Sequence, residues 1–317
     1  MSAGDVMAEE SKRTVLAAFA ANFSIAIAKL VAGLLTGSGA MLAEAVHSVA
    51  DTVNQVFLLV GINLSDTEAD DDHPHGYGKE AFFWSFLVAI FIFVGGATFA
   101  FFEGARTLVE SEFHERSTTE LAVAFSVLGM AFLFEGASLA VAIRAIRRRA
   151  RTRDWSYWQY LRQSPDMTTK TVFWEDSAAT IGLVIAATGL AAAEVDRSVV
   201  WDGLASVGIG TLLTGVALML GLQARHLLLG AAAPDDTRRV LRSTVLGFDE
   251  VERVVRLLTM QLGSHSVLVT GELQVRRGLT TKEIETLVRR IDSAIAEELP
   301  QVRETFWELR SQVVDLS

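Results

Sequence analysis

Residues 38–64 form an apolar stretch long enough to cross a bilayer as a helix, for which about 20 residues suffice. The stretch reads SGAMLAEAVHSVADTVNQVFLLVGINL. Polar residues recur within it at intervals of three and four: Glu44, His47, Ser48, Asp51, Asn54 and Gln55. This spacing places them on one face of a helix. Ionisable groups at bilayer depth cost about 2.5 kcal/mol or more each, so this face is expected to look into a protein interior or a wet cavity.

His47 and Asp51 are separated by one helical turn on this face. An imidazole nitrogen and a carboxylate oxygen so placed can converge on one ion, and the combination suits zinc and its first-row neighbours. The alternative is a His–Asp hydrogen bond that joins helices without any metal. Intramembrane charges are functional by default, which favours the metal interpretation.

Composition limits the class of protein. The chain has 317 residues, of which 50% are hydrophobic, and it has no cysteine, which excludes disulfides and thiolate metal sites. The net charge of −10 is segregated between apolar spans, a basic loop and an acidic C-terminal third, so nucleic acid is not an expected partner. The N-terminal apolar run has no small-residue cleavage site after it, so we expect it to be retained as a span.

Six stretches are candidate membrane spans. They lie near residues 12–35, 39–63, 80–108, 118–146, 168–192 and 198–222. An even number of spans places both termini on one side of the membrane. A dense basic cluster follows the fourth span: Arg144, Arg147, Arg148, Arg149, Arg151 and Arg153. Because basic loops stay in the cytoplasm, we expect the termini and this loop to be cytoplasmic.

Other spans also carry polar residues. Asn22 and Lys29 in the first span are expected to face inward. In the fifth span Glu175 and Asp176 are adjacent and point about 100° apart, so one of them is expected to complete a site with the second span. Asp202 opens the sixth span, where a capping role, or helix pairing through the small residues around it, is the better interpretation.

The connection before the third span concentrates possible metal ligands. Its sequence DTEADDDHPHGYGKE contains four aspartates, two histidines and little apolar surface. Asp70, His73 and His75 could hold a divalent ion in a flexible loop. They could equally be solvated loop residues, and the sequence leaves both interpretations open.

Hydropathy falls from Pro234 onward and the pattern changes to that of a small α+β domain. The predicted elements are a helix over 235–246, strands over 251–261 and 265–276, a Thr-capped helix over 280–298 and a strand over 304–313. The predicted fold class is therefore a membrane all-α domain over 1–230, followed by a cytosolic αββαβ, ferredoxin-like domain over 231–317. Dimerisation or regulation is its expected role.

The motifs TGSGAMLAEAVHSVADTVNQ, HPHGYGK and EGA, on a six-span plan, resemble the cation diffusion facilitator family over nearly the whole chain. The resemblance implies a metal site at His47 and Asp51 and a second ligand pair in span five that ends at Asp176. The other position of that pair falls on Val172, which cannot bind metal. The segment FWEDSAATIG resembles the branch containing the ninth human zinc transporter, which implies that Glu175 substitutes for the missing ligand. The alternative is that Glu175 pairs with Lys29.

The resemblance also covers the loop and the C-terminal domain. The loop site maps onto Asp70 and His73, its next histidine position falls on Tyr77, and His75 could compensate. In the C-terminal domain the expected histidine position of the last strand is occupied by Phe306 and Trp307. We therefore expect the domain to form a homodimer without a binuclear zinc centre.

These observations predict an antiporter of divalent cations and protons that moves zinc out of the cytoplasm. Manganese, cobalt or iron are alternative cargoes, and a non-transporting, metal-responsive membrane scaffold is the rival class. An enzyme is not expected, because the chain lacks the HExxH motif of a zinc hydrolase. No cofactor is expected beyond the transported ion. The expected location is a bacterial plasma membrane, with the lipid bilayer, a second copy of the chain, metal ions and protons as partners.

Overall fold

The computed structural model describes residues 22–110, 113 and 115–310. They form two compact units that are not continuous in sequence. The first unit contains Met1–Gly61, Trp84–Tyr160 and Thr168–Gln223. The second contains Ile62–Phe83, Leu161–Met167 and Ala224–Ser317.

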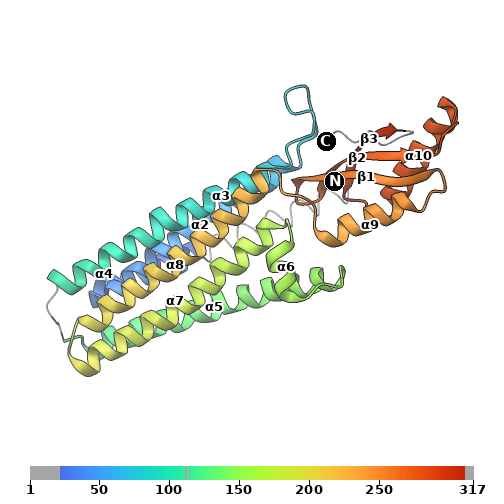
Figure 1. The fold of residues 1–317 in the computed structure, drawn as a ribbon. Coiled ribbons are helices and arrows are strands. Elements are labelled where there is room, and N and C mark those ends of the chain that lie inside the picture. The colour runs from blue at the N-terminus through green and yellow to red at the C-terminus, as the bar shows by residue number, and fades with distance from the viewer. Residues whose placement is uncertain (1–21, 111–112, 114, 311–317) are drawn as a thin grey trace, which may run out of the picture. The chain divides into compact units, whose positions relative to one another are not determined.

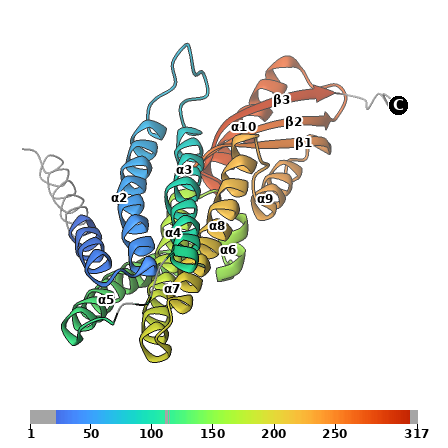
Figure 2. The same cartoon turned by 90° about the vertical axis from the view of Figure 1, so that its left-hand side faces the viewer.

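Long helices build the first unit. They are α2 (Gly39–Ser65), α3 (Glu80–Phe91), the π-helix η1 (Ile92–Ala97), α4 (Thr98–Glu110), α5 (Thr118–Arg151), α7 (Met167–Asp196) and α8 (Val200–Leu228). In both views α2, α4, α7 and α8 run alongside one another (Figures 1 and 2). The short helix α6 (Tyr157–Gln163) follows the basic end of α5.

Five helices within the described residues are long and apolar enough to cross a membrane, with α3, η1 and α4 counted as one. Their length and composition indicate an integral, multi-pass membrane protein. A shorter apolar helix covers Asn22–Thr36. The predicted first span, near 12–35, lies partly outside the described residues, so a sixth span stays a prediction.

Local sequence explains where helices start and how closely they pack. Ser117 and Glu120 form a capping box at the start of α5, which satisfies backbone N–H groups that the helix leaves free. Gly104 of α4 and Gly203 of α8 let these helices approach, since an added Cβ would lie 2.8 Å from Val207 Cγ2 and 2.6 Å from Leu108 Cγ respectively. The predicted helix-pairing role of small residues in the sixth span is confirmed.

The second unit contains a three-stranded sheet of order β1-β2-β3. Its elements are α9 (Asp235–Leu246), β1 (Val251–Gly263), β2 (Ser266–Val275), α10 (Thr281–Glu298) and β3 (Val302–Arg310). β1 and β2 are antiparallel, whereas β3 returns parallel to β2 after α10. The predicted αββαβ order is confirmed, and so is the Thr280 cap of α10. The ferredoxin-like label is not confirmed, because the described part of the sheet has three strands.

One face of this sheet packs against α9 and α10. Val254, Val267 and Val269 lie in the core that also contains Leu241 and Ile291 of the two helices. Because these three valines are buried in this core, they stabilise the fold of the domain itself. The opposite face carries exposed apolar side chains, among them Leu258 and Phe306.

Candidate metal centre

The polar face of α2 is buried, as its spacing predicts. Glu44, His47, Ser48 and Asn54 are all buried side chains on this helix. His47 Nδ1 lies 3.5 Å from Asp51 Oδ1, so the structure brings the predicted pair together. Both ring nitrogens of His47 and Oδ1 of Asp51 are buried without a hydrogen bond to any described residue. Buried polar atoms normally have a partner, so these three atoms are available to a ligand.

The π-helix η1 lies beside His47. A Cβ placed on Gly96 would be 3.9 Å from His47 Nδ1 and 3.1 Å from Leu213 Cδ1, which leaves little room for any other residue. Single π-helical turns inside α-helices are often found at functional sites. The sequence analysis missed η1. The Gly95-Gly96 pair inside an apolar span was the signal that could have pointed to it.

The two acidic residues of α7 are held by different helices. Glu175 is buried, and its Oε1 accepts a hydrogen bond of 2.7 Å from Asn54 Nδ2 of α2. Asp176 Oδ2 accepts one of 2.7 Å from Ser138 Oγ of α5. Their negative charges both act on Asp51. Glu175 therefore faces the polar face of α2, and Asp176 faces α5, as the offset between adjacent helical residues requires.

The four predicted ligands do not form one closed cluster. Within the described residues, no group of three or more His, Asp or Glu side chains is close enough to hold a metal ion. His47 and Asp51 are together, while Glu175 and Asp176 are engaged by Asn54 and Ser138. Their assignment as ligands stays a prediction, in which each α7 carboxylate moves closer to the pair and binds metal through the oxygen that does not accept these hydrogen bonds.

Lys29 does not pair with Glu175, so the alternative considered for Glu175 is wrong. Its ammonium donates to Glu44 Oε2 at 3.2 Å and to Ser48 Oγ at 2.6 Å. The expectation that Lys29 faces inward is confirmed, since its side chain is 0% exposed. Helical spacing does not tell which residue of another helix lies opposite Lys29, so the sequence alone did not identify Glu44 as its partner.

Glu135 of α5 is an acidic residue that the sequence analysis did not assign to the site. Its charge acts on Asp51, Glu175 and Asp176, so it lies on the side of α5 that faces them. Ser138 follows it by three residues on the same helix. The signal was present in the sequence, because Glu135 is an acidic residue inside an apolar span.

Asp202 caps the N-terminus of α2 instead of its own helix. Its carboxylate accepts hydrogen bonds from Ser38 Oγ at 2.5 Å and from the backbone N–H of Gly39 at 2.6 Å. A carboxylate at this position satisfies backbone donors and complements the helix dipole. Asp202 therefore has a capping role, but at the start of α2 and not of the sixth span that it opens, and this contact ties α8 to the helix that carries His47.

The loop between α2 and α3 separates the three residues of the predicted second site. Asp70 accepts hydrogen bonds from the His73 backbone N–H at 2.7 Å and from the Tyr77 hydroxyl at 2.8 Å. These bonds hold the pKa of Asp70 below its ordinary value. His75 contacts a different carboxylate, since its Nδ1 lies 2.7 Å from Glu304 Oε2 of β3. The structure thus brings together Asp70 and His73, but not His75.

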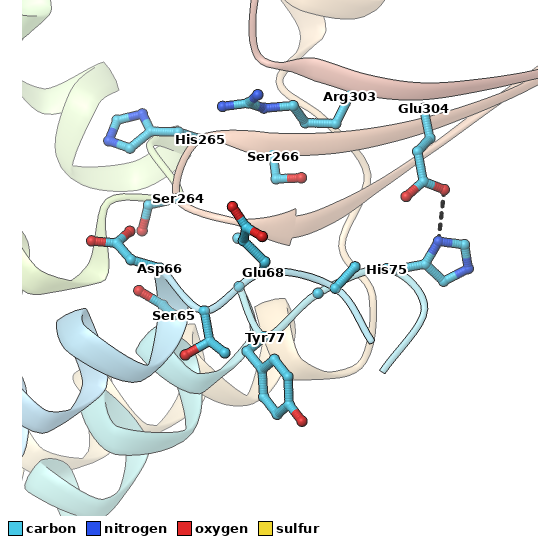
Figure 3. A pocket seen from close by; sticks show the side chains of 15 residues that line it. Ser65, Asp66, Glu68, His75, Tyr77, Ser264, His265, Ser266, Arg303 and Glu304 are labelled. Atoms are coloured by element: carbon cyan, nitrogen blue, oxygen red, sulfur yellow. Dashed lines mark hydrogen bonds and ion pairs between the residues drawn. The ribbon is translucent and has the colours of Figure 1, made fainter. Parts of the chain in front are cut away.

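His75 and Glu304 lie at the edge of a cavity within the second unit (Figure 3). The cavity measures about 460 Å³. Its labelled lining includes Asp66, Glu68 and His265 besides the His75–Glu304 pair. The ionisable side chains of this lining include both acidic and basic groups. A role for His75 in place of the Tyr77 position would use its Nε2, because Nδ1 contacts Glu304.

Comparison with known proteins identifies relatives of the chain. Residues 15–229 match the family described as cation efflux transmembrane domain. The Xenopus laevis proton-coupled zinc antiporter SLC30A9, mitochondrial, is 36% identical over 213 residues, which are 67% of this chain and 37% of that protein. The human protein of the same name is 29% identical over 300 residues, or 93% of this chain and 52% of that protein. The cation-efflux pump FieF of Klebsiella pneumoniae is 25% identical over 288 residues, or 91% of this chain and 89% of the pump.

The resemblance to the branch of the ninth human zinc transporter is confirmed by these matches. The chain spans about half or less of the length of the SLC30A9 relatives.

Proposed function

The chain belongs to the cation diffusion facilitator family, also called the cation efflux family, and from this premise we propose that it exports zinc from the cytoplasm in exchange for protons. Cation efflux is the general activity of the family, and a transporter of this kind is not an enzyme. The choice of zinc and protons is supported by the relatives named proton-coupled zinc antiporter. The transported ion is a substrate, and no cofactor is assigned.

The proposal rests on three buried atoms that could bind a metal ion, namely the two ring nitrogens of His47 and Oδ1 of Asp51. His47 is 1% exposed, and its two ring nitrogens have no hydrogen bond to a described residue. An imidazole and carboxylates are the nitrogen and oxygen ligands that zinc accepts, and water can fill an open position. The Glu175 and Asp176 carboxylates are the further ligands in this proposal, with Glu175 in the role that Val172 cannot fill.

Proton exchange follows from the chemistry of these ligands. Histidine must be neutral and carboxylates ionised to bind metal, so metal and protons compete for the same groups. If the site opens alternately to the two sides, metal leaves on one side when protons replace it. A non-transporting scaffold needs no such ligands inside a span. Manganese, cobalt and iron also accept nitrogen and oxygen ligands, and they are the competing ions in the test.

The orientation and assembly are part of the proposal. We propose that the arginines at the end of α5 lie in the cytoplasm, together with both termini. The protein acts as a homodimer in a lipid bilayer. The relatives' names include a mitochondrial antiporter and a bacterial efflux pump, so the expected bacterial plasma membrane stays a prediction.

The test uses the purified chain in proteoliposomes with a zinc-sensitive dye inside and an imposed pH gradient. We expect zinc to enter when protons can leave, and internal pH to rise as it does so. His47→Ala is expected to stop both fluxes, whereas Val49→Ala is the matched control, because Val49 is a 45% exposed side chain on the same helix. A zinc flux that does not depend on the pH gradient indicates a uniporter. Zinc binding without any flux indicates the scaffold.

A further inference from the structure

Lys29 and Glu44 form a buried ion pair that the proposed exchange does not use. Both side chains are 0% exposed, and Lys29 Nζ lies 3.2 Å from Glu44 Oε2. Lys29 belongs to the helix Asn22–Thr36 and Glu44 to α2. A buried charge without a partner is strongly destabilising, so each of these groups needs the other to be tolerated at this depth.

The position of Glu44 is tightly limited by its neighbours. Lys29 holds Oε2, while Oε1 has no hydrogen bond to any residue that the structure describes. A Cβ added to Gly182 of α7 would collide with Oε1, so the carboxylate would have to shift from this position if that residue were not glycine. Glu44 is thus inserted between two helices with one oxygen free.

This pair lies beside the His47–Asp51 site. Glu44 precedes His47 by three residues on the same helix, and Ser48, the second partner of Lys29, directly follows His47. The positive charge of Lys29 acts on both His47 and Asp51. A fixed cation at this position opposes the binding of a divalent cation, unless the charge of Glu44 cancels it.

We propose that Lys29 and Glu44 together set the metal affinity of the His47–Asp51 site, with Lys29 as a fixed counter-cation and Glu44 as the carboxylate that neutralises it. The proposal rests on the proposed function, because it assumes a metal ion at that site. Removing Glu44 leaves Lys29 to repel the metal. Removing Lys29 leaves Glu44 as an additional negative charge with a free oxygen, which holds the metal more tightly and slows its release.

The two single variants are therefore expected to change affinity in opposite directions. Zinc binding to the purified full-length chain is measured by calorimetry at one pH. The dissociation constant is expected to rise at least about tenfold in Glu44→Gln and to fall at least about tenfold in Lys29→Met, as the signs of the charges require. The double variant restores neutrality and is expected within about threefold of the wild type.

Two controls separate charge from structure. Ser48→Ala removes the hydrogen bond to Lys29 but no charge, and is expected to leave zinc affinity within about threefold. Lys29→Arg keeps the charge and is expected to behave likewise. A purely structural ion pair instead predicts less folded protein in both single variants, with unchanged affinity in what remains.

The outcome distinguishes this inference from the proposed function. If the wild type binds zinc and His47→Ala does not, but the two single variants shift affinity in the same direction or not at all, the inference is wrong and the proposed function stands. If the wild type and His47→Ala are equally unable to bind zinc, the proposed function fails and the inference with it. Should Lys29→Met not fold, Glu44→Gln and the double variant still give the sign.

Discussion

The hydrogen bond between Asn54 and Glu175 gives the sharpest test of the site. Asn54 is buried on α2 and its Nδ2 lies 2.7 Å from Glu175 Oε1. Asn54→Leu removes the amide while keeping the branching and the number of heavy atoms of the side chain. A hydrogen bond to a charged group contributes about 1.5–3 kcal/mol, and loss of a residue that orients a metal ligand weakens metal binding about 10–100-fold. The two figures agree, since a factor of ten corresponds to about 1.4 kcal/mol.

The expected result is a zinc dissociation constant that rises about 10–100-fold in Asn54→Leu. The measurement is a calorimetric zinc titration of the purified chain, with zinc flux in proteoliposomes as a second readout. Thr52→Val is the matched control, because Thr52 is buried on the same helix and its hydroxyl donates to the Ser48 carbonyl of that helix at 2.9 Å. Its affinity for zinc is expected to stay that of the wild type.

Glu175→Gln completes the test. If Glu175 is a ligand positioned by Asn54, this change weakens zinc binding at least as strongly as Asn54→Leu. Because Glu175 is 6% exposed, both variants are checked for folding by thermal unfolding in detergent. Wild-type zinc affinity in folded Asn54→Leu and folded Glu175→Gln would refute the assignment of Glu175 as a ligand.

Four further predictions follow from the site, the loop and the second unit. Alanine at His47, Asp51 or Asp176 should abolish zinc transport in proteoliposomes without loss of folded protein. A wild-type transport rate in any of these variants would contradict this prediction. In the loop, His73→Ala with His75→Ala should shift metal affinity but leave some proton-driven exchange. Complete loss of zinc transport in folded protein would mean that the loop residues are essential for transport. Tyr77→Phe should raise the pKa of Asp70 toward its ordinary value in an NMR titration, because the carboxylate loses one donor and keeps the backbone N–H of His73. The Tyr77–Asp70 hydrogen bond stabilises the loop fully above the unfolded-state pKa of aspartate, and this stability is lost as pH falls through the lowered pKa of Asp70. Dimers of the full chain in detergent should persist when a chelator is added, as measured by light scattering. The reason is that residues 234–317 contain one histidine, His265, and no cysteine. Monomers formed on adding the chelator would contradict this prediction.

Local sequence determined the elements of the second unit almost to the residue. α9 has the predicted bounds, α10 begins after the predicted Thr280 cap, and β1 extends two residues beyond its predicted end. These elements depend on caps, turns and alternation between neighbours in the chain, which the sequence displays directly. The burial of the α2 polar face, and the pairing of His47 with Asp51, were predictable for the same reason.

Tertiary structure decided which side chains meet across helices. Lys29 pairs with Glu44 instead of Glu175, Glu175 is held by Asn54, and His75 is bound to Glu304, 229 positions away in the chain. Such partners depend on how each helix is rotated and shifted against its neighbours, and that is set by packing, as at Gly182, where an added Cβ would make the Glu44 carboxylate shift. Spacing within a helix shows which face is polar, but the residue opposite that face is known only when the helices are packed together.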